Sequence, residues 1–401
     1  MANLDTIKQY NDGDLIPNNY EETYLATRYV QDEQLIIEDK IVDKLKSAVE
    51  AEGLYFDDED IYKEIVAGLL RGNIILQGPP GTGKTTLAAI VCRVFKTNMD
   101  VVTAVSDWTT YDTIGGYQPA VDDEGNEIIT GKNGRVIESV KNCCETILKN
   151  KHYSGGTQAT WLVIDELNRC EIDKVFGDLF TAFGSDKAEN RKIPLWFNDD
   201  PNKKIIYVPQ RFRIIGLMNN FDKNFVFDLS HGLARRFTII SVLPPVESKF
   251  TEEIEQCKEI IAKEIPVKIS KIGSTVINET QIKSYFTDSE FVSIEKKVSL
   301  LLKQIRYAGE NNLNLQYGTA QIIDFYENII IQMILDDYAS VAPAEKASRL
   351  EKIVDSAFNS RIVPQLDGID YLRLKKFYQN IQSATEYAWL TKSIKTISEL
   401  V

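Results

Sequence analysis

Apolar positions follow two patterns along the chain. Short, mostly apolar runs occupy residues 73–77, 161–164 and 213–217, and runs of this length are typical of strands buried on both faces of a parallel sheet. Directly after the first of these strands and its glycine-rich loop, residues 87–95 (LAAIVCRVF) have the spacing of an amphipathic helix. The middle of the chain therefore predicts an α/β fold with a parallel sheet.

The pattern changes after Pro244-Pro245, a pair that marks a break. Beyond it, apolar residues recur every three or four positions, which predicts helices over residues 291–307, 321–335 and 344–362. The residues before the core are polar, with one predicted helix over Ile41–Ala51. We therefore expect three parts: an N-terminal polar and helical segment (1–51), an α/β nucleotide-binding core (52–244), and an α-helical C-terminal region (245–401).

Two insertions within the core are predicted to form β-hairpins. In the first, Gly115–Val140, two β-prone runs flank a predicted turn at Gly131–Gly134. In the second, Ile193–Pro209, a turn signal at Asp200-Pro201-Asn202 separates two runs. Each insertion is thus expected to extend from the sheet as a strand pair.

Composition narrows the class of protein. The 401 residues are 43% hydrophobic and 26% charged, as in ordinary globular proteins. No apolar run approaches the ~18 residues of a membrane helix, and the polar N-terminus lacks a signal core, so we expect a cytoplasmic protein without a membrane partner. Scattered cysteines and two histidines, His152 and His231, make a zinc site or His-based catalysis a poor interpretation.

The net charge of the chain indicates whether it is suited to bind nucleic acid directly. The balance of 46 basic and 59 acidic residues gives −13, whereas a long non-specific nucleic-acid groove usually makes a domain basic. An acidic chain can still carry a local basic patch. Any contact with nucleic acid is therefore expected to be indirect.

The strongest chemical signal is GPPGTGKTT, which matches G-x-x-x-x-G-K-[ST] between a strand and a helix. Such a P-loop presents backbone N–H groups to an anion, and the following helix adds its positive N-terminal end. Lys84 is expected to reach the β- and γ-phosphates, and the Thr85 hydroxyl to ligate Mg²⁺. The predicted nucleotide-binding residues are Gly78, Pro79, Gly81, Thr82, Gly83, Lys84, Thr85 and Thr86.

Two carboxylates end the second apolar run, at the strand terminus where open α/β sheets bind ligands. Asp165 is expected to hold Mg²⁺ through water, and Glu166 to polarise the attacking water. A surface acidic pair is the weaker interpretation, because both residues directly follow a buried strand downstream of a P-loop.

The third run ends at Asn219, whose amide could orient water beside the γ-phosphate, although asparagine is common after strands. Arg235 and Arg236 follow in GLARRF. They could cover a helix end or act as an arginine finger on the γ-phosphate of a neighbouring subunit. The residues alone leave these alternatives open.

The P-loop, the strand ending in two carboxylates, the strand ending at Asn219 and the arginine pair follow one another in an order that resembles the AAA+ ATPases. The segments YDTIGGYQP, VIDELNR, VPQRFRIIGLMNNFD and GLARRF are similar to the MoxR, dynein-related and McrB branch over about Asn73–Phe237. IIGLMNNFD and DELNR are most similar to McrB-type restriction motors, which use GTP. The resemblance implies a helical lid after the core, a ring, by analogy a hexamer, and hairpins that line a pore or face partners. Solvated hairpins without function are the alternative.

The chain departs from that family at three places. The McrB pattern continues with a T-A-D-R-S-like loop tied to guanine nucleotides, but this chain reads Asn219–Asn224 (NNFDKN), so ATP is favoured and GTP stays open. Ala234 stands where the finger motif often has arginine. Gln321 replaces the arginine of the lid's sensor-2 position.

The leading hypothesis is a ring-forming NTPase motor that drives remodelling or translocation with a separate effector, such as a nuclease, in bacterial restriction or anti-phage defence. The alternatives are a MoxR-like chaperone and a nucleotide-gated scaffold, and the intact Lys84, Asp165 and Glu166 argue against the scaffold. A nuclease encoded beside this chain would favour the motor over the chaperone.

Overall fold

The computed structural model describes residues 27–401, apart from 29, 55, 57, 151–155, 186, 199, 201–203, 220–234, 273–274 and 316. Contacts divide the chain into two compact units. The first takes in Asp58–Gly78, Lys84–Val242 and the described residues before 55, and the second takes in Pro79–Gly83 and Leu243–Val401. Among the described residues, no helix has the length and apolar character to cross a membrane.

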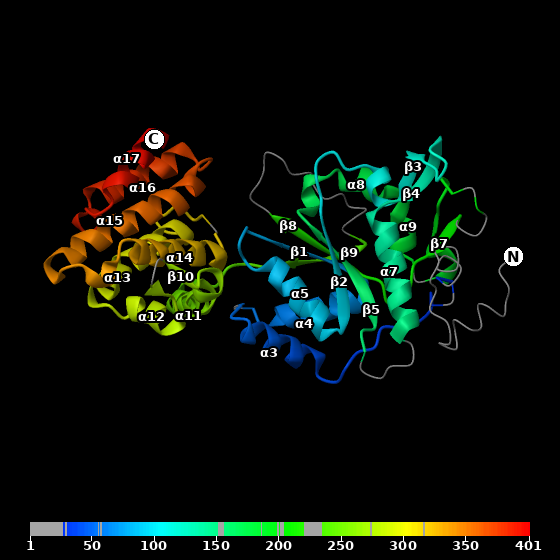
Figure 1. Ribbon diagram of the computed structural model, residues 1–401, viewed down its shortest axis with the longest axis horizontal. Helices are drawn as coiled ribbons and strands as arrows, with labels where there is room; N and C mark the ends of the chain where they lie inside the picture. The colour runs from blue at the N-terminus through cyan, green and yellow to red at the C-terminus, as the bar shows by residue number, and fades with distance from the viewer. Residues whose placement is uncertain are drawn as a thin grey trace. The chain divides into compact units, whose positions relative to one another are not determined.

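A five-stranded parallel sheet in the order β2-β5-β8-β1-β9 forms the centre of the first unit (Figure 1). Its interior is apolar, as in Ile74, Ile75 and Leu76, which are fully buried, because helices cover both faces of such sheets. The strands are β1 (Asn73–Gly78), β2 (Thr97–Thr103), β5 (Ala159–Asp165), β8 (Ile214–Asn219) and β9 (Phe237–Ser241).

Helices pack on both faces of this sheet. α5 leads from β1 to β2, and α7 leads back from β2 to β5, so right-handed crossovers place these two helices on opposite faces. α3 packs against both α5 and α4 (Figure 1). The helices of this unit are α3 (Ile41–Ala51), α4 (Asp60–Arg71), α5 (Lys84–Val94), α6 (Thr110–Thr113), α7 (Arg135–Asn150), α8 (Ile172–Phe176) and α9 (Phe180–Phe183), with short 3-10 turns at Leu167–Arg169, Gly177–Leu179 and Ala188–Asn190.

Both predicted insertions contain antiparallel strand pairs. β3 (Gly115–Val121) pairs with β4 (Glu127–Asn133), and β6 (Lys192–Pro194) pairs with β7 (Ile205–Tyr207). The aromatic rings of Tyr117 and Trp196, one from each insertion, meet edge to face with centroids 5.6 Å apart. Residues 201 and 202 of the second predicted turn lie outside the described residues.

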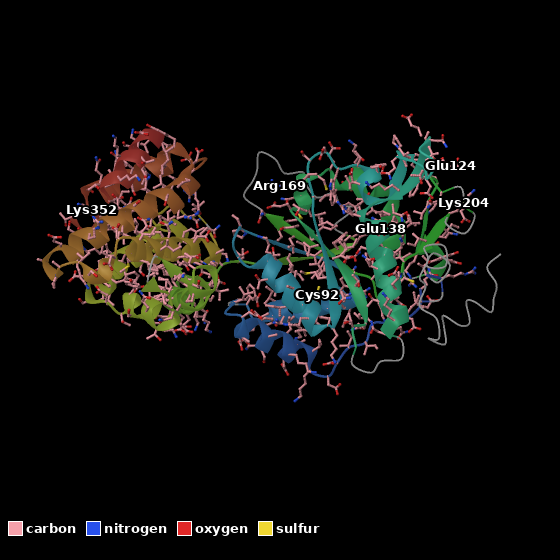
Figure 2. All side chains as sticks on the ribbon, in the orientation of Figure 1. Cys92, Glu124, Glu138, Arg169, Lys204 and Lys352 are labelled. Atoms are coloured by element: carbon pink, nitrogen blue, oxygen red, sulfur yellow. The ribbon has the colours of Figure 1, made fainter. Side chains whose placement is uncertain are left out.

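The predicted turn at Gly131–Gly134 is wrong. The chain reverses at residues 122–126, where the Asp122 carboxylate accepts the N–H groups of Glu124 and Asn126, and Gly125 has a φ of 87°. Figure 2 labels Glu124 at this hairpin tip. The run RVIES, expected as a strand, instead begins helix α7. In a short run, valine and isoleucine are compatible with either a strand or a helix. Here the buried residues of α7 recur at helical spacing, so the run forms a helix.

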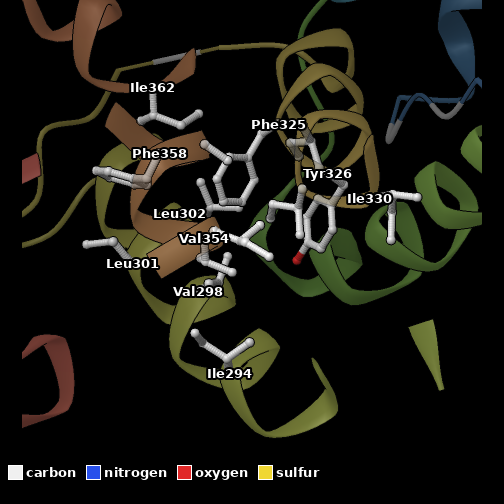
Figure 3. Close-up of a cluster of buried hydrophobic side chains, with 14 of the residues drawn as sticks. Ile294, Val298, Leu301, Leu302, Phe325, Tyr326, Ile330, Val354, Phe358 and Ile362 are labelled. Atoms are coloured by element: carbon white, nitrogen blue, oxygen red, sulfur yellow. The ribbon is translucent and has the colours of Figure 1, made fainter. Parts of the chain in front are cut away.

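The second unit is helical and has its own core. Val298, Phe325 and Phe358, from α13, α14 and α15, meet in the apolar cluster of Figure 3. The three helices predicted after residue 245 are present within a few residues of their expected ends, and the predicted fold class is confirmed. The helices are α11 (Phe250–Lys268), α12 (Glu279–Phe286), α13 (Ser289–Arg306), α14 (Thr319–Leu335), α15 (Pro343–Arg361), α16 (Tyr371–Ser383) and α17 (Thr391–Leu400), with 3-10 turns at Glu247–Lys249, Tyr338–Ser340, Val363–Leu366 and Thr385–Tyr387 and a strand pair β10 (Lys271–Ile272) and β11 (Thr275–Val276).

Candidate nucleotide-binding site

The P-loop joins the end of β1 to the start of α5. Gly81 and Gly83 have φ angles of 73° and 79°, in the left-handed region that glycine enters without steric cost. The Thr82 hydroxyl donates to the Pro79 carbonyl at 3.0 Å and closes the turn. A turn of this kind before a helix N-terminus is a phosphate-binding arrangement.

Lys84 is buried at the first position of α5, with 7% of its surface exposed. Its Nζ donates to the Gly78 carbonyl at 3.1 Å. Burial lowers the pKa of Lys84 to about 8, and the nearby carboxylates of Glu166 and Asp165 oppose that shift. The side chain therefore carries its charge at neutral pH and begins to lose it in mildly alkaline solution.

This lowered pKa predicts a pH dependence of triphosphate binding. Phosphate esters are fully ionised well above their second pKa of about 6, so between pH 7.5 and 9.5 the loss of the Lys84 proton should weaken binding, at most tenfold per pH unit for one proton. We expect the Kd for ATP to rise about tenfold over this range, measured by titration with a fluorescent analogue. Lys84→Arg keeps its charge, so its Kd should change little with pH; an equal rise in this variant would contradict the role of Lys84.

Asp165 and Glu166 follow each other at the carboxyl end of β5. The Glu166 N–H donates to Asp165 Oδ1 at 2.9 Å. Glu166 has a φ of 52°, a left-handed conformation that is uncommon for a residue other than glycine and costs about 1–2 kcal/mol. Backbone strain of this kind concentrates at functional sites.

Two side chains hold the Glu166 carboxylate. Asn219 Nδ2 donates to Glu166 Oε1 at 2.6 Å, and Arg169 Nε lies 3.2 Å from Glu166 Oε2. Arg169 is labelled in Figure 2. These contacts join the ends of two neighbouring strands, β5 and β8, at one edge of the sheet.

Asn219 is fixed in turn by Asn168, whose Nδ2 donates to the Asn219 carbonyl at 2.9 Å. Asn219 is also the register partner of Gly78 on β1. Its Oδ1 is buried and has no hydrogen-bond partner among the described residues. Asn168 and Arg169 are not among the predicted site residues, although the i, i+3 spacing of Glu166 and Arg169 is a signal for a side-chain pair.

Arg235 and Arg236 lie at the opposite side of the sheet, where the parallel strands begin. They immediately precede β9, whose first residue, Phe237, pairs with Asn73, the first residue of β1. Gly78 is five residue steps further along β1, or about 16 Å at ~3.3 Å per residue. Arg235 is exposed, and Arg236 Nε donates to the Phe180 carbonyl at 2.9 Å with its guanidinium 4.9 Å from the Phe180 ring centre.

The structure therefore brings Lys84, Asp165, Glu166 and Asn219 to one edge and does not bring the two arginines to them. Residues 220–224, which belong to the segment whose sequence favours ATP, and Ala234 lie outside the described residues.

Residues 73–237 match the family model described as AAA domain (dynein-related subfamily). This segment is similar to AAA domains. A match to this family implies nucleotide binding, typically with Mg²⁺, and NTP hydrolysis.

Two proteins that are similar to this chain are named as parts of restriction enzymes. The chain is 30% identical over 184 residues to the EcoKMcrB subunit of a type IV methyl-directed restriction enzyme from Escherichia coli, covering 44% of this chain and 36% of that protein. It is 28% identical over 198 residues to YdiS, a component of the type II restriction enzyme BsuMI from Bacillus subtilis, covering 41% of this chain and 55% of YdiS. The predicted similarity to McrB-type proteins is confirmed, and the matches span only about a third and about half of these two relatives.

A solved structure of a protein described as a putative ATPase, from Cytophaga hutchinsonii, aligns with 95% of this chain and 97% of its own, at 15% identity and a TM-score of 0.35.

Gln321, which the resemblance to AAA+ proteins aligns with the sensor-2 position, contacts backbone groups of the second unit. Its Nε2 donates to the Pro80 carbonyl at 3.2 Å, and its Oε1 accepts the Gly318 N–H at 3.0 Å. The Ala320 N–H donates to the Gly81 carbonyl at 3.0 Å. An amide in this place holds peptide groups of the P-loop and supplies no charge for a phosphate.

Proposed function

We propose that this chain is a ring-forming motor that hydrolyses ATP and couples the reaction to remodelling or translocation with a separate effector, a nuclease, in bacterial restriction or anti-phage defence. One observation carries the catalytic part: Asn219 Nδ2 donates to Glu166 Oε1 at 2.6 Å, beside a P-loop whose lysine is charged and buried. The names of the two relatives, both parts of restriction enzymes, support the biological part.

The residues fit a magnesium triphosphate. Mg²⁺ keeps several waters and takes one or two protein oxygens besides substrate phosphates, and Thr85 and Asp165 supply an oxygen set of this kind. No group of three or more His, Cys, Asp or Glu that could hold a metal by itself is found in the part of the chain that the structure describes. When bound, Mg²⁺ neutralises charge that develops on the phosphate oxygens.

Each residue then has a defined task. Lys84 and the P-loop hold the β- and γ-phosphates. Glu166, kept in place by Asn219 and Arg169, accepts the proton of the attacking water. The free lone pairs of Asn219 Oδ1 can accept a hydrogen bond from that water and fix its direction.

The experiment that tests this function pairs the chain with a nuclease encoded beside its gene. Purified together, the two should form a complex that cleaves DNA only while triphosphate is hydrolysed, and Lys84→Ala should abolish cleavage without dissociating the nuclease polypeptide. Hydrolysis stimulated by an unfolded protein, with no nuclease bound, would support the chaperone alternative and reject the restriction motor.

ATP is expected to be the better substrate, because the sequence after Met218 lacks the T-A-D-R-S-like loop associated with GTP. One base-specific hydrogen bond changes affinity by about tenfold, so unlabelled ATP should displace a labelled triphosphate at about a tenth of the GTP concentration. The measurement is a competition titration with CTP as a control for binding of the phosphates alone. A clear advantage for GTP would reject the proposed base preference.

A further inference from the structure

Two backbone N–H groups at the start of helix α14 hold carbonyls of the P-loop. The Gly318 N–H donates to the Pro80 carbonyl at 3.2 Å, and the Ala320 N–H donates to the Gly81 carbonyl at 3.0 Å. By their contacts, the loop residues Pro79–Gly83 belong to the same compact unit as α14. Part of the P-loop is therefore packed as an element of the helical unit.

These two bonds set the direction of the neighbouring N–H groups of the loop. A trans peptide unit is planar, so its C=O and its N–H point in opposite directions. The Pro80 carbonyl shares a peptide unit with the Gly81 N–H, and the Gly81 carbonyl shares one with the Thr82 N–H. Because both carbonyls point at α14, both N–H groups point away from it, to one side of the loop.

The N–H groups of Gly81 and Thr82 are available to a ligand. No hydrogen bond joins either of them to another residue that the structure describes. Gly81 has a φ of 73°, and successive N–H groups around a left-handed residue form a concavity that binds anions. A carbonyl that accepts a hydrogen bond also polarises the N–H of its own peptide unit. The contacts with α14 therefore aim and strengthen two donors for a phosphate oxygen.

Close approach of the loop explains the glycine before α14. Gly318 has a φ of −90° and a ψ of −178°, angles that any residue adopts, so the backbone conformation does not require glycine. A Cβ at this position would lie 2.1 Å from the carbonyl carbon and oxygen of Gly81 and 2.4 Å from the backbone nitrogen of Thr82. These are backbone atoms, which cannot move aside as the end of a flexible side chain can. A side chain here would push the loop away from α14.

A buried ion pair fixes the first residue of α14. The Thr319 hydroxyl donates to Glu253 Oε1 at 2.6 Å, and Arg306 Nη1 lies 2.7 Å from Glu253 Oε2. Glu253 and Arg306 are 3% and 1% exposed, and two charges removed from water in this way compensate each other. The start of α14 is thus anchored in the interior of the helical unit, which gives the loop a fixed support.

Helix capping explains only part of this arrangement. Gln321 Oε1 accepts the Gly318 N–H at 3.0 Å, as in a capping box. A cap needs no contact with a distant segment, because water can satisfy the first N–H groups of a helix. Here the Gln321 amide also donates to the Pro80 carbonyl at 3.2 Å. The start of α14 therefore directs its donors to the loop.

We infer that Gly318 and Ala320 are positioning residues for phosphate binding: they hold the P-loop so that the N–H groups of Gly81 and Thr82 face the phosphates. The inference rests on nucleotide binding at the P-loop, which is part of the proposed function. Their own N–H groups are occupied by loop carbonyls, so the effect reaches the ligand through the loop. It acts on the phosphates and is independent of the base.

Ala320→Pro tests the inference most directly, because it removes one N–H and keeps the helix. Proline is tolerated in the first turn, where the N–H has no intrahelical partner, and Ala320 is exposed. Loss of the bond to the Gly81 carbonyl should raise the Kd for magnesium-ATP about tenfold. The Kd for inorganic tripolyphosphate should rise by the same factor, and both are measured on the whole chain by isothermal titration calorimetry.

Thr280→Pro is the matched control. Thr280 is exposed and holds the same second position in α12, a helix of the same unit. Its two Kd values should stay within about twofold of wild type, and both proline variants should unfold at about the same temperature. In hydrolysis, Ala320→Pro should raise KM by the same factor as Kd and leave kcat within about twofold, as expected when binding of the phosphates alone is weakened.

Gly318→Ala makes the same test without a proline, since its backbone angles suit alanine, and should also raise both Kd values about tenfold or more. Equal Kd values in Ala320→Pro and Thr280→Pro, or a loss confined to ATP and absent for tripolyphosphate, would overturn the inference. The titrations need no hydrolysis. A chain that binds triphosphate as expected but drives no nuclease would therefore reject the proposed motor and leave the inference intact, whereas a wild-type chain that binds no triphosphate would overturn both.

Discussion

Glu166→Gln is expected to lower the rate of ATP hydrolysis by about 10²–10⁴-fold, the range that general-base catalysis contributes, while ATP binding changes by less than about threefold. A glutamine oxygen can still accept the hydrogen bond that Asn219 Nδ2 donates to Glu166 Oε1 at 2.6 Å. The hydrogen bond between the ends of β5 and β8 is therefore kept, while the ability to accept a proton and the ion pair with Arg169 are lost.

Two measurements check this prediction: phosphate release under saturating ATP, and Kd from a fluorescent analogue. Glu171→Gln is the matched control, because Glu171 is an exposed carboxylate five residues further along, paired only loosely with Lys174 at 3.9 Å. It should hydrolyse ATP at the normal rate. If Glu166→Gln turned over as fast as the control, another group would have to be the base.

Arg235→Ala and Arg236→Ala should each bind ATP and hydrolyse it about 10³-fold more slowly, the lower end of the effect of an arginine finger. The physical reason is distance: both arginines stand at the start of β9, and the P-loop of the same chain begins about 16 Å away at the other edge of the sheet. They can act on a triphosphate only if it belongs to another subunit.

Mixing two variant proteins distinguishes the loss of an arginine finger from a local folding defect. Arg236 also binds the Phe180 carbonyl, so its loss could loosen α9. When either arginine variant is mixed with Lys84→Ala, some interfaces combine an intact P-loop with an intact arginine, and hydrolysis should partly return. A local folding defect would not be corrected by a partner subunit. Normal rates in both single variants and in the double variant, or full hydrolysis by a monomer, would reject the finger.

Much of the candidate site follows from local sequence. The P-loop between an apolar strand and a helix, and the carboxylates directly after an apolar run, are signals contained within about ten residues each. The rule that ligands bind at the carboxyl ends of parallel strands then places Gly78, Asp165 and Asn219 at one edge. The chemical roles of these residues stay predictions that the variants above test.

The first hairpin shows where local signals were insufficient. Glycines at 131 and 134 and the β-branched run after them favoured a turn and a strand, whereas the Asp122–Asn126 segment forms the turn and the run begins α7. Valine and isoleucine are compatible with either element in five residues, so burial against β5 had to decide.

The chain by itself determined the fold class, the P-loop and the strand ends, because strand and helix periodicity and the phosphate loop are encoded in neighbouring residues. Only the tertiary structure decided which strand ends touch: the order β5-β8-β1-β9 puts Asn219 against Glu166 at one edge and gathers Arg71, Arg213 and Arg236 at the other. That order depends on how helices cover both sheet faces, a long-range burial that no local pattern contains.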